Sequence, residues 1–338
     1  NANDDVNMSQ SSNDVIPTAI CISALIDMHR ILLPNMDGLI KAIDVKMKKV
    51  KGNTKTGRTH LMDAMPIDFA QELSGWKAQL ESSKKTLIAA TSRMNELPQG
   101  GTAIGTGINT HKDFSKNFCE EVNKIAKLKT KPAKNFFQGL SSVDNAAELS
   151  SALKNLSTIL MKISNDLRWM NSGPLTGLGE IELEALQPGS SIMPGKVNPV
   201  VPEAVAMACA DVIGNDVSIT VASQSGNFQL NVMLPLVAYN LLKSINLLGN
   251  AMPLLSNKAI KTFKINAKNI NESLSKNPIL VTALNRKIGY GKAALIAKKA
   301  YKENKAIIDV ASEETGISKA ELKKLLDPSK LTKGGLSG

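Results

Sequence analysis

The clearest hydrophobic pattern lies in the middle of the chain and has the period of a helix. Its apolar residues recur at alternating steps of four and three, and they are Leu149, Leu153, Leu156, Leu160, Ile163, Leu167 and Met170. This spacing puts them on one stripe of a helix, as in helices that pack at a shallow angle in a bundle. Gly173 and Pro174 follow and are typical of a helix end.

Four further segments show long helical patterns. The five predicted helices cover residues 14–50, 66–96, 144–171, 202–222 and 228–256. Asp14 is expected to cap the first helix and Pro34 to interrupt it, because proline has no amide hydrogen to continue the ladder. Residues 52–63 are expected to form a polar loop, and residues 181–183 are the one short strand candidate. The sequence therefore predicts an all-α fold.

Helices of this length bear on assembly and on domain organisation. About 30 residues at ~1.5 Å per residue span ~45 Å, and a single bundle of such helices would expose apolar seams on several sides. We therefore expect a homo-oligomer held by helix–helix packing. The chain is predicted to divide into an N-terminal remnant (residues 1–13), a central helical bundle domain (14–256) and a small, more basic C-terminal helical domain (257–338).

Composition excludes several classes of protein. The 338 residues are 43% hydrophobic but only 4% aromatic, which fits a globular helical protein. The net charge of +11 comes largely from separate lysine runs without interleaved aromatic residues, so we expect solvated faces and no nucleic-acid partner. No uninterrupted apolar run has membrane-spanning length, which predicts a soluble protein with no membrane partner. The three cysteines are far apart, show no metal-binding spacing and indicate a reducing compartment.

The stretch that carries the most chemistry is QPGSSIMPGKVNP, residues 187–199. Its prolines and glycines exclude a helix interior or a central strand and make the loop stiff. Ser190, Lys196 and Asn198 supply a hydroxyl, a positive charge and an amide. This set suits gripping a carboxylate and removing a proton from the carbon beside it. The alternative is an ordinary polar loop between helices, which the length and order of the motif disfavour.

Other motifs have plainer interpretations when each is taken alone. The glycine-rich segment at residues 98–110 lacks the order of a phosphate-binding loop and follows a helix, so it is interpreted as a tight turn. Ser11, Ser12 and Asn13 alone would be a helix cap. Glu203 alone would be a first-turn glutamate favoured by the helix dipole. His60 alone would as readily be a structural histidine.

Taken together, four stretches resemble the fumarase/aspartase superfamily. They read NDDVNMSQSSNDVIPTA (3–19), GRTHLMDAMP (57–66), GGTAIGTGINTH (100–111) and PGSSIMPGKVNP (188–199). A fifth, SGNFQLNV (225–232), adds to the likeness, which covers essentially the whole chain. His60 favours the class II fumarate hydratases, because aspartases usually carry glutamine there. The pair Gly195–Lys196, where aspartases tend to have Ala–Lys, points the same way.

The resemblance implies an architecture. Family members are all-α, and a central five-helix bundle assembles into a twenty-helix core in a homotetramer. Active sites form where segments of three subunits meet. Members also have an N-terminal domain before the segment that matches Asn3, so this chain resembles a truncated fumarase, and the resemblance leaves open whether the fragment itself is active as an enzyme. The compartment would be the cytoplasm of a bacterium or the mitochondrial matrix of a eukaryote.

The resemblance also implies a reaction, the reversible anti addition of water to fumarate to give (S)-malate through an aci-carboxylate intermediate, without cofactor or metal. Ser190 would take the proton, and His60, oriented and charged by Glu203, would protonate the leaving hydroxide. The substrate would be gripped by Ser11, Ser12, Asn13, Thr59, Ser191, Lys196 and Asn198. Asn3 and Asp4 match part of a second dicarboxylate site, where the family usually has histidine in place of Asn1.

Two other functions remain open from the sequence. An aspartate ammonia lyase shares the Ser190 loop and the VVPE segment that follows Pro199. A non-catalytic helical scaffold is the third hypothesis, motivated by the missing N-terminal region.

Overall fold

The structure is a computed structural model that describes residues 1–335 of the chain. It contains two compact units, each assembled from three stretches of sequence. The first unit comprises Asn1–Ala42, Ala78–Asp166 and Pro188–Ala259, and the second comprises Ile43–Lys77, Leu167–Gln187 and Ile260–Gly338. The boundary between the two sets of residues falls within three long helices, α2 (Leu33–Val50), α3 (Phe69–Arg93) and α6 (Asp144–Met170). The three segments expected from the sequence (1–13, 14–256 and 257–338) divide the chain differently and stay a prediction.

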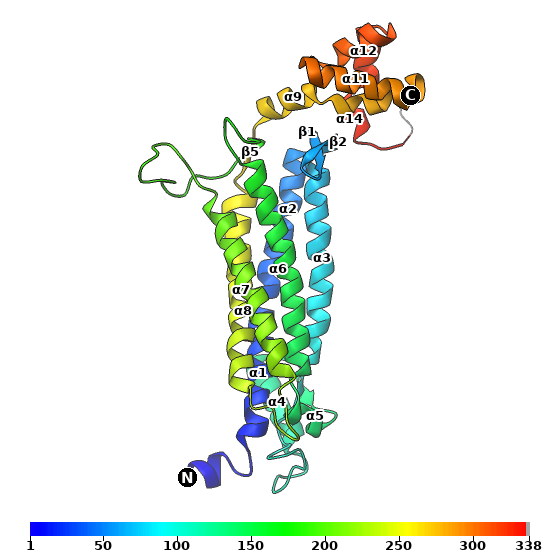
Figure 1. Cartoon of the computed structure of the whole chain (residues 1–338). Coiled ribbons are helices and arrows are strands. Elements are labelled where there is room, and N and C mark those ends of the chain that lie inside the picture. The colour runs from blue at the N-terminus through cyan, green and yellow to red at the C-terminus, as the bar shows by residue number, and fades with distance from the viewer. Residues whose placement is uncertain (336–338) are drawn as a thin grey trace. The chain divides into compact units, whose positions relative to one another are not determined.

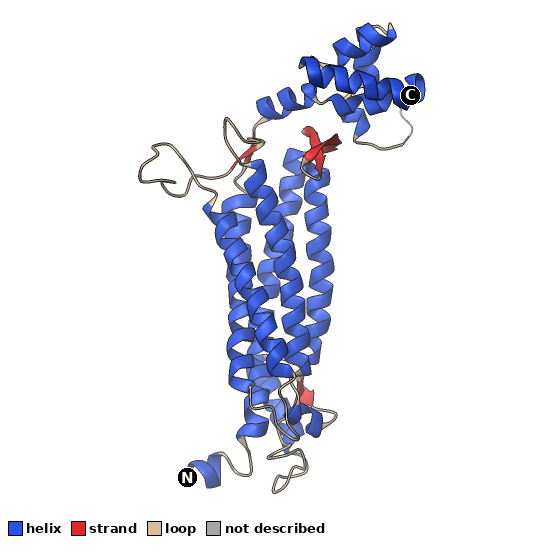
Figure 2. Cartoon of the chain, viewed as in Figure 1, coloured by secondary structure: helices blue, strands red, loops and turns tan. Residues whose placement is uncertain are grey.

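Helices dominate both units, as the all-α prediction requires (Figures 1 and 2). The other α-helices are α1 (Ser12–Asp27), α4 (Phe114–Ala126), α5 (Phe136–Ser141), α7 (Val200–Ser223), α8 (Leu234–Leu255), α9 (Ala267–Lys276), α10 (Asn285–Ile288), α11 (Tyr290–Glu303), α12 (Ile307–Thr315), α13 (Lys319–Leu325) and α14 (Pro328–Leu331). Short π- or 3₁₀-helices are η1 (Ala2–Val6), η2 (Met28–Leu32), η3 (Ser256–Ile260) and η4 (Pro278–Leu284). Strands pair two by two: β1 (Thr54–Thr59) with β2 (Met62–Asp68), β3 (Glu96–Leu97) with β4 (Lys131–Pro132), and β5 (Ile181–Glu182) with β6 (Lys264–Ile265).

The apolar stripe of α6 is a core element, as its period predicted. Leu149, Leu153, Leu156, Leu160 and Ile163 are all fully buried inside the first unit. In the same unit α7 packs along α8, and α1 packs on α8 as well. A buried carboxylate also ties α7 to α6, because Asp216 accepts a hydrogen bond of 2.8 Å from Ser150 and pairs with Lys154 at 2.5 Å.

The first long helix is interrupted where proline was expected to act. The π-turn η2 ends two residues before Pro34, so the ladder already has an irregular step where the missing amide of Pro34 would leave a carbonyl unpaired. Helix α8 passes very close here, and a Cβ atom added to Gly249 would lie 2.8 Å from Cγ2 of Ile31. The side-chain amide of Asn35 donates to the Gly249 carbonyl at 2.9 Å and fixes this contact.

One part of the helix prediction was wrong. Residues 54–68 form the antiparallel hairpin β1–β2, so residues 52–63 are not simply a loop and α3 does not begin at Pro66. Helix α3 begins after Asp68, whose carboxylate accepts from the amide of Ala70 at 2.8 Å while its own amide donates to Gln71. This is a reciprocal cap of the capping-box kind, a stronger start signal than the proline.

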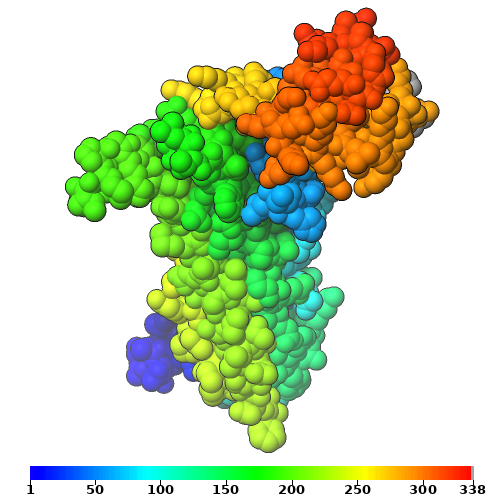
Figure 3. Space-filling view, turned by 45° about the horizontal axis from the view of Figure 1, so that its top comes forward, coloured from blue at the N-terminus to red at the C-terminus, as the bar shows by residue number. Residues whose placement is uncertain are grey.

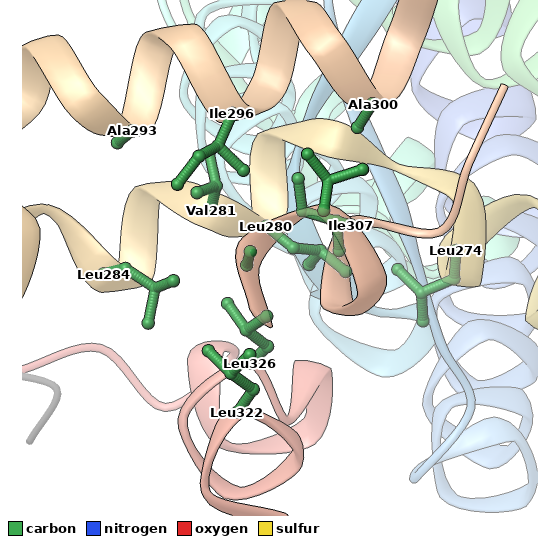
Figure 4. Packing of buried hydrophobic residues seen from close by; sticks show 12 residues of the cluster. Leu274, Leu280, Val281, Leu284, Ala293, Ile296, Ala300, Ile307, Leu322 and Leu326 are labelled. Carbon is green, nitrogen blue, oxygen red and sulfur yellow. The ribbon is translucent and has the colours of Figure 1, made fainter. Parts of the chain in front are cut away.

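The helices after η3 enclose a core of their own in the second unit. Figure 4 shows the apolar side chains of this cluster pointing toward one another from α9, η4, α11, α12 and α13. The buried members are Leu274, Leu280, Val281, Leu284, Ala293, Ile296, Ala300, Ile307, Val310, Ala311, Leu322 and Leu326. The small helical C-terminal part predicted from the sequence therefore has a hydrophobic core.

The cysteines and the apolar helices were both interpreted from the sequence. All three cysteines are buried free thiols, and burial raises the pKa of Cys21 and of Cys209 to about 12.

By length and hydropathy alone, Ser12–Val50 and Val200–Ser223 would qualify to cross a membrane, with mean hydropathies of 1.6 and 1.4 in their most apolar windows. Only 44% and 33% of those windows are buried inside the chain. The absence of a membrane partner stays a prediction.

Candidate active site

The Ser190 loop is closed by its own backbone and by one side chain. The amide of Gly189 donates to the carbonyl of Lys196 at 2.9 Å, and the side-chain amide of Asn198 donates to the Gly189 carbonyl at 2.8 Å. A Cβ atom at position 189 would lie 2.1 Å from the Lys196 carbonyl oxygen, so the closure requires glycine there. The loop therefore has a defined shape, and Asn198 contributes to that shape.

Inside this loop two backbone amides donate hydrogen bonds to the Ser190 hydroxyl. Its Oγ accepts from the backbone amides of Ile192 at 3.3 Å and Met193 at 3.1 Å. Two amides aimed at one oxygen stabilise negative charge on it, so they favour the alkoxide that a serine base needs. Ser190 is half-buried, whereas Ser191 and Lys196 are exposed on the loop, which lies at the surface (Figure 3).

Glu203 lies in the first turn of α7, five residues beyond Asn198. It is half-buried, and its amide donates to the carbonyl of Pro199 at 3.2 Å. A carboxylate in the first turn also interacts favourably with the helix dipole. The position of Glu203 therefore agrees with the role beside His60 that the resemblance implies and with that of an ordinary first-turn glutamate.

Asp14 connects the segment Ser11–Asn13 to the glycine-rich loop. From the sequence, Asp14 was expected to be the cap of the first helix. Ser11, not Asp14, is the N-cap of α1: its Oγ accepts from the Asn13 amide at 3.2 Å, and Asp14 completes a capping box. The fully buried Asp14 carboxylate also accepts from the amides of Gly100 and Thr102, both at 2.9 Å.

A further bond at this junction joins Asn13 to the glycine-rich loop. The side-chain amide of Asn13 donates to the carbonyl of Ala103 at 2.8 Å. The amides of Gly100 and Thr102 donate to the Asp14 carboxylate inside the protein, which supports the tight-turn interpretation of residues 98–110. Ser12 stays exposed beside them.

Asn3 and Asp4 lie in the exposed turn η1. The side chain of Asn1 caps this turn, accepting from the amide of Asn3 at 2.9 Å and of Asp4 at 3.4 Å. The Asn1 side chain is therefore a local cap, and the second dicarboxylate site stays a prediction.

His60 and Thr59 belong to the second unit, at the tip of the β1–β2 hairpin. The pair Thr59–Met62 closes a two-residue turn made of His60 and Leu61, with φ values of 55° and 60°. Both residues are in the left-handed region, as a type I′ hairpin turn requires, although neither is glycine. Such backbone outliers concentrate at functional sites, and His60 is exposed there.

A cavity in the first unit is separate from these residues. It has a volume of about 300 Å³ and is lined by α1, α5 and the start of α6, including Cys21, Gln138 and Asn145. None of the predicted site residues lines it, so it is not the candidate active site.

Comparisons with known proteins place the chain in a family. A profile described as "Lyase" matches residues 1–214, and one described as "Fumarase C C-terminus" matches residues 280–333. The chain is 57% identical to fumarate hydratase class II 2 of Pseudomonas aeruginosa, over 99% of this chain and 73% of that protein. It is 43% identical to fumarate hydratase class II of Bacillus subtilis, over 98% of this chain and 72% of the relative.

Solved structures agree with these relatives. The class II fumarase of Schistosoma mansoni superimposes with a TM-score of 0.95 at 34% identity, covering 98% of this chain and 72% of that one. A fumarate lyase:delta crystallin protein of Brucella melitensis gives 0.92 at 39% identity, covering 98% and 71%. The fold is therefore that of the fumarate lyases. Within them, the chain belongs to the class II fumarate hydratase family.

Proposed function

We propose that this protein is a hydro-lyase that catalyses the reversible hydration of fumarate to (S)-malate, the step of the tricarboxylic acid cycle that class II fumarate hydratases perform. The observation that carries the proposal is the Ser190 hydroxyl, which accepts two backbone amides within a loop that also bears Lys196 and Asn198. A base of this kind is needed because the proton beside the malate carboxylate is only weakly acidic. Family membership supplies the substrate.

In the direction of malate dehydration, the Ser190 alkoxide takes the proton from the carbon beside one carboxylate. The electron pair left behind moves into that carboxylate and gives a doubly negative aci-carboxylate. The positive charge of Lys196, with the amide of Asn198 and the hydroxyl of Ser191, stabilises this charge more than it stabilises the substrate, which is what lowers the barrier.

The second half of the reaction breaks the carbon–oxygen bond on the opposite face. His60 donates a proton to the departing hydroxyl, so that water leaves and the electron pair of the aci-carboxylate forms the double bond of fumarate. Imidazole suits this step because it changes protonation state near neutral pH. Glu203 would orient His60 and favour its charged form, and Ser11, Ser12, Asn13 and Thr59 would bind the remaining polar groups.

The proposal includes a homotetramer, in which each site joins residues of different copies. Helix α7 supports it, because Met207, Val217 and Val221 are 68%, 59% and 51% exposed on the single chain. Leu236 and Tyr239 add exposed apolar surface on α8. Apolar surface spread along long helices fits burial against other copies in the twenty-helix core implied by the resemblance.

Purified protein is expected to consume fumarate, measured as loss of absorbance of its conjugated double bond, and to form malate. The aspartate ammonia lyase hypothesis predicts release of ammonia from aspartate under the same conditions. Faster ammonia release than fumarate hydration would reject the proposal in favour of the lyase. An intact oligomer with neither activity would favour the scaffold hypothesis. The compartment, cytoplasm or mitochondrial matrix, stays a prediction.

A further inference from the structure

We propose that Arg58, through its ion pair with Glu180, positions His60 for catalysis; this inference rests on the proposed function. Arg58 lies in β1 two residues before His60 and pairs across the hairpin with Asp63. Its Nη1 lies 2.6 Å from Oε1 of Glu180. All of these residues belong to the second unit.

Glu180 is a fixed point in this unit because both its side chain and its backbone are held. Its other carboxylate oxygen lies 2.8 Å from Nζ of Lys55, in a pair whose side chains are 3% and 5% exposed. Its amide donates to the carbonyl of Met170 at 2.8 Å, and its carbonyl accepts from the amide of Asn266 at 2.9 Å.

Lys55 connects Glu180 to helix α3. Its ammonium group also lies 2.7 Å from Oε2 of Glu72 on α3 and 4.7 Å from the centre of the Phe69 ring. Two carboxylates and two cations thus form one compact cluster without excess charge. Removing one partner of a buried ion pair leaves an unpaired charge in the interior, which costs free energy. The cluster therefore resists displacement of any member.

Asn277 also holds the hairpin, because its side-chain amide donates to the Ala64 carbonyl at 2.9 Å, but that bond is farther along the chain from His60 than Arg58 is. A two-stranded hairpin is marginally stable by itself. Leu61 and Met62 are 66% and 70% exposed, so apolar packing does not fix the tip. The strand is also bulged at Gly57, where an added Cβ atom would lie 2.6 Å from the Met65 carbonyl oxygen. The Arg58 side chain is therefore the anchor nearest to His60 on β1.

Loss of the Arg58 anchor should consequently affect the chemical step more than binding. Most of the proposed substrate grip lies on the Ser190 loop and in Ser11–Asn13, away from β1 in sequence, and Thr59 is its one member on β1. A small misplacement of the proton donor lowers the rate steeply, because proton transfer needs a short, aligned path.

The test is a double-mutant cycle with Arg58→Gln and His60→Gln, scored by kcat and KM for fumarate. Arg58→Gln alone is expected to lower kcat by about tenfold or more and to change KM by less than about twofold. Arg58→Lys, which keeps the charge, should recover part of the loss, and it takes the place of Arg58→Gln if that variant does not fold. In the His60→Gln protein, already slowed by about 10²-fold or more, the Arg58 substitution should have no further effect on kcat.

A matched control separates positioning from the general loss of an ion pair. Lys287 pairs with Glu321 at 2.8 Å in the same unit, with both side chains about half exposed, so Lys287→Gln should leave kcat unchanged. An equal loss from Arg58→Gln in both backgrounds, or no loss in the parent protein, would overturn the positioning role. Full activity of His60→Gln alone would instead overturn the role of His60, and the inference with it.

Discussion

Replacing Ser190 by alanine is expected to lower kcat for fumarate hydration by about 10²- to 10⁴-fold, the usual contribution of a positioned general base. The substitution removes the oxygen that accepts the amides of Ile192 and Met193. The bonds that close the loop, from Gly189 to Lys196 and from Asn198 to Gly189, do not involve the lost hydroxyl. Substrate binding should therefore change much less than turnover, and KM is the parameter that shows this.

A matched serine substitution provides the control. The Ser92 hydroxyl is exposed and only donates to the carbonyl of Ala89, near the end of α3, so Ser92→Ala should keep full activity. Steady-state kinetics of both variants, with melting temperatures to confirm folding, make the comparison. If Ser190→Ala kept more than about a tenth of the parental kcat, Ser190 would not be the base.

The second large effect is expected for Leu156→Asp, which should prevent folding of the chain. If the apolar stripe of α6 faced other subunits, the new charge would disrupt the assembly and leave the fold of the single chain intact. Leu156 is fully buried within its own chain, however, so the new carboxylate would be buried before any assembly. Burying an unpaired charge costs several kcal/mol, a large part of a domain's stability.

This outcome is measured by soluble yield and thermal unfolding, with Leu156→Met as the partner variant. The methionine keeps the apolar volume and should cost less than about 1.5 kcal/mol. A Leu156→Asp protein that melted like the parent but ran as a smaller oligomer would show that the seam faces another copy. In that case the burial of α6 within one chain would be the wrong basis for the account.

The helices could be predicted from the sequence because their signals are local. The stripe from Leu149 to Met170 has seven apolar positions at helical spacing, and tertiary structure only has to bury it. The hairpin β1–β2 was missed because its alternation is carried by threonine, lysine and arginine instead of large apolar residues. Long-range contacts support it, among them those of Lys55 and Arg58 with Glu180, more than a hundred positions away. The capping pair Asp68 and Gln71 was a readable signal for the start of α3.

The residues of the candidate site also differ in whether the sequence alone predicts them. Ser190, Lys196 and Asn198 stand within one short motif whose chemistry can be inferred from residue types. Asp14 and Glu180 have no such motif, because their partners are brought together only by the fold. A buried carboxylate that accepts amides of Gly100 and Thr102 looks, in sequence, like an ordinary first-turn aspartate. The residues that support a site are therefore harder to predict than those that perform its chemistry.

The most direct test of the catalytic proposal is a crystal structure of the assembled protein with malate bound. It should show the carbon that loses its proton beside the Ser190 hydroxyl of one copy and the malate hydroxyl facing His60 of a neighbouring copy. Lys196 and Asn198 should contact the carboxylate next to Ser190. Malate bound in an assembled protein without Ser190 and His60 on its two sides would contradict the mechanism.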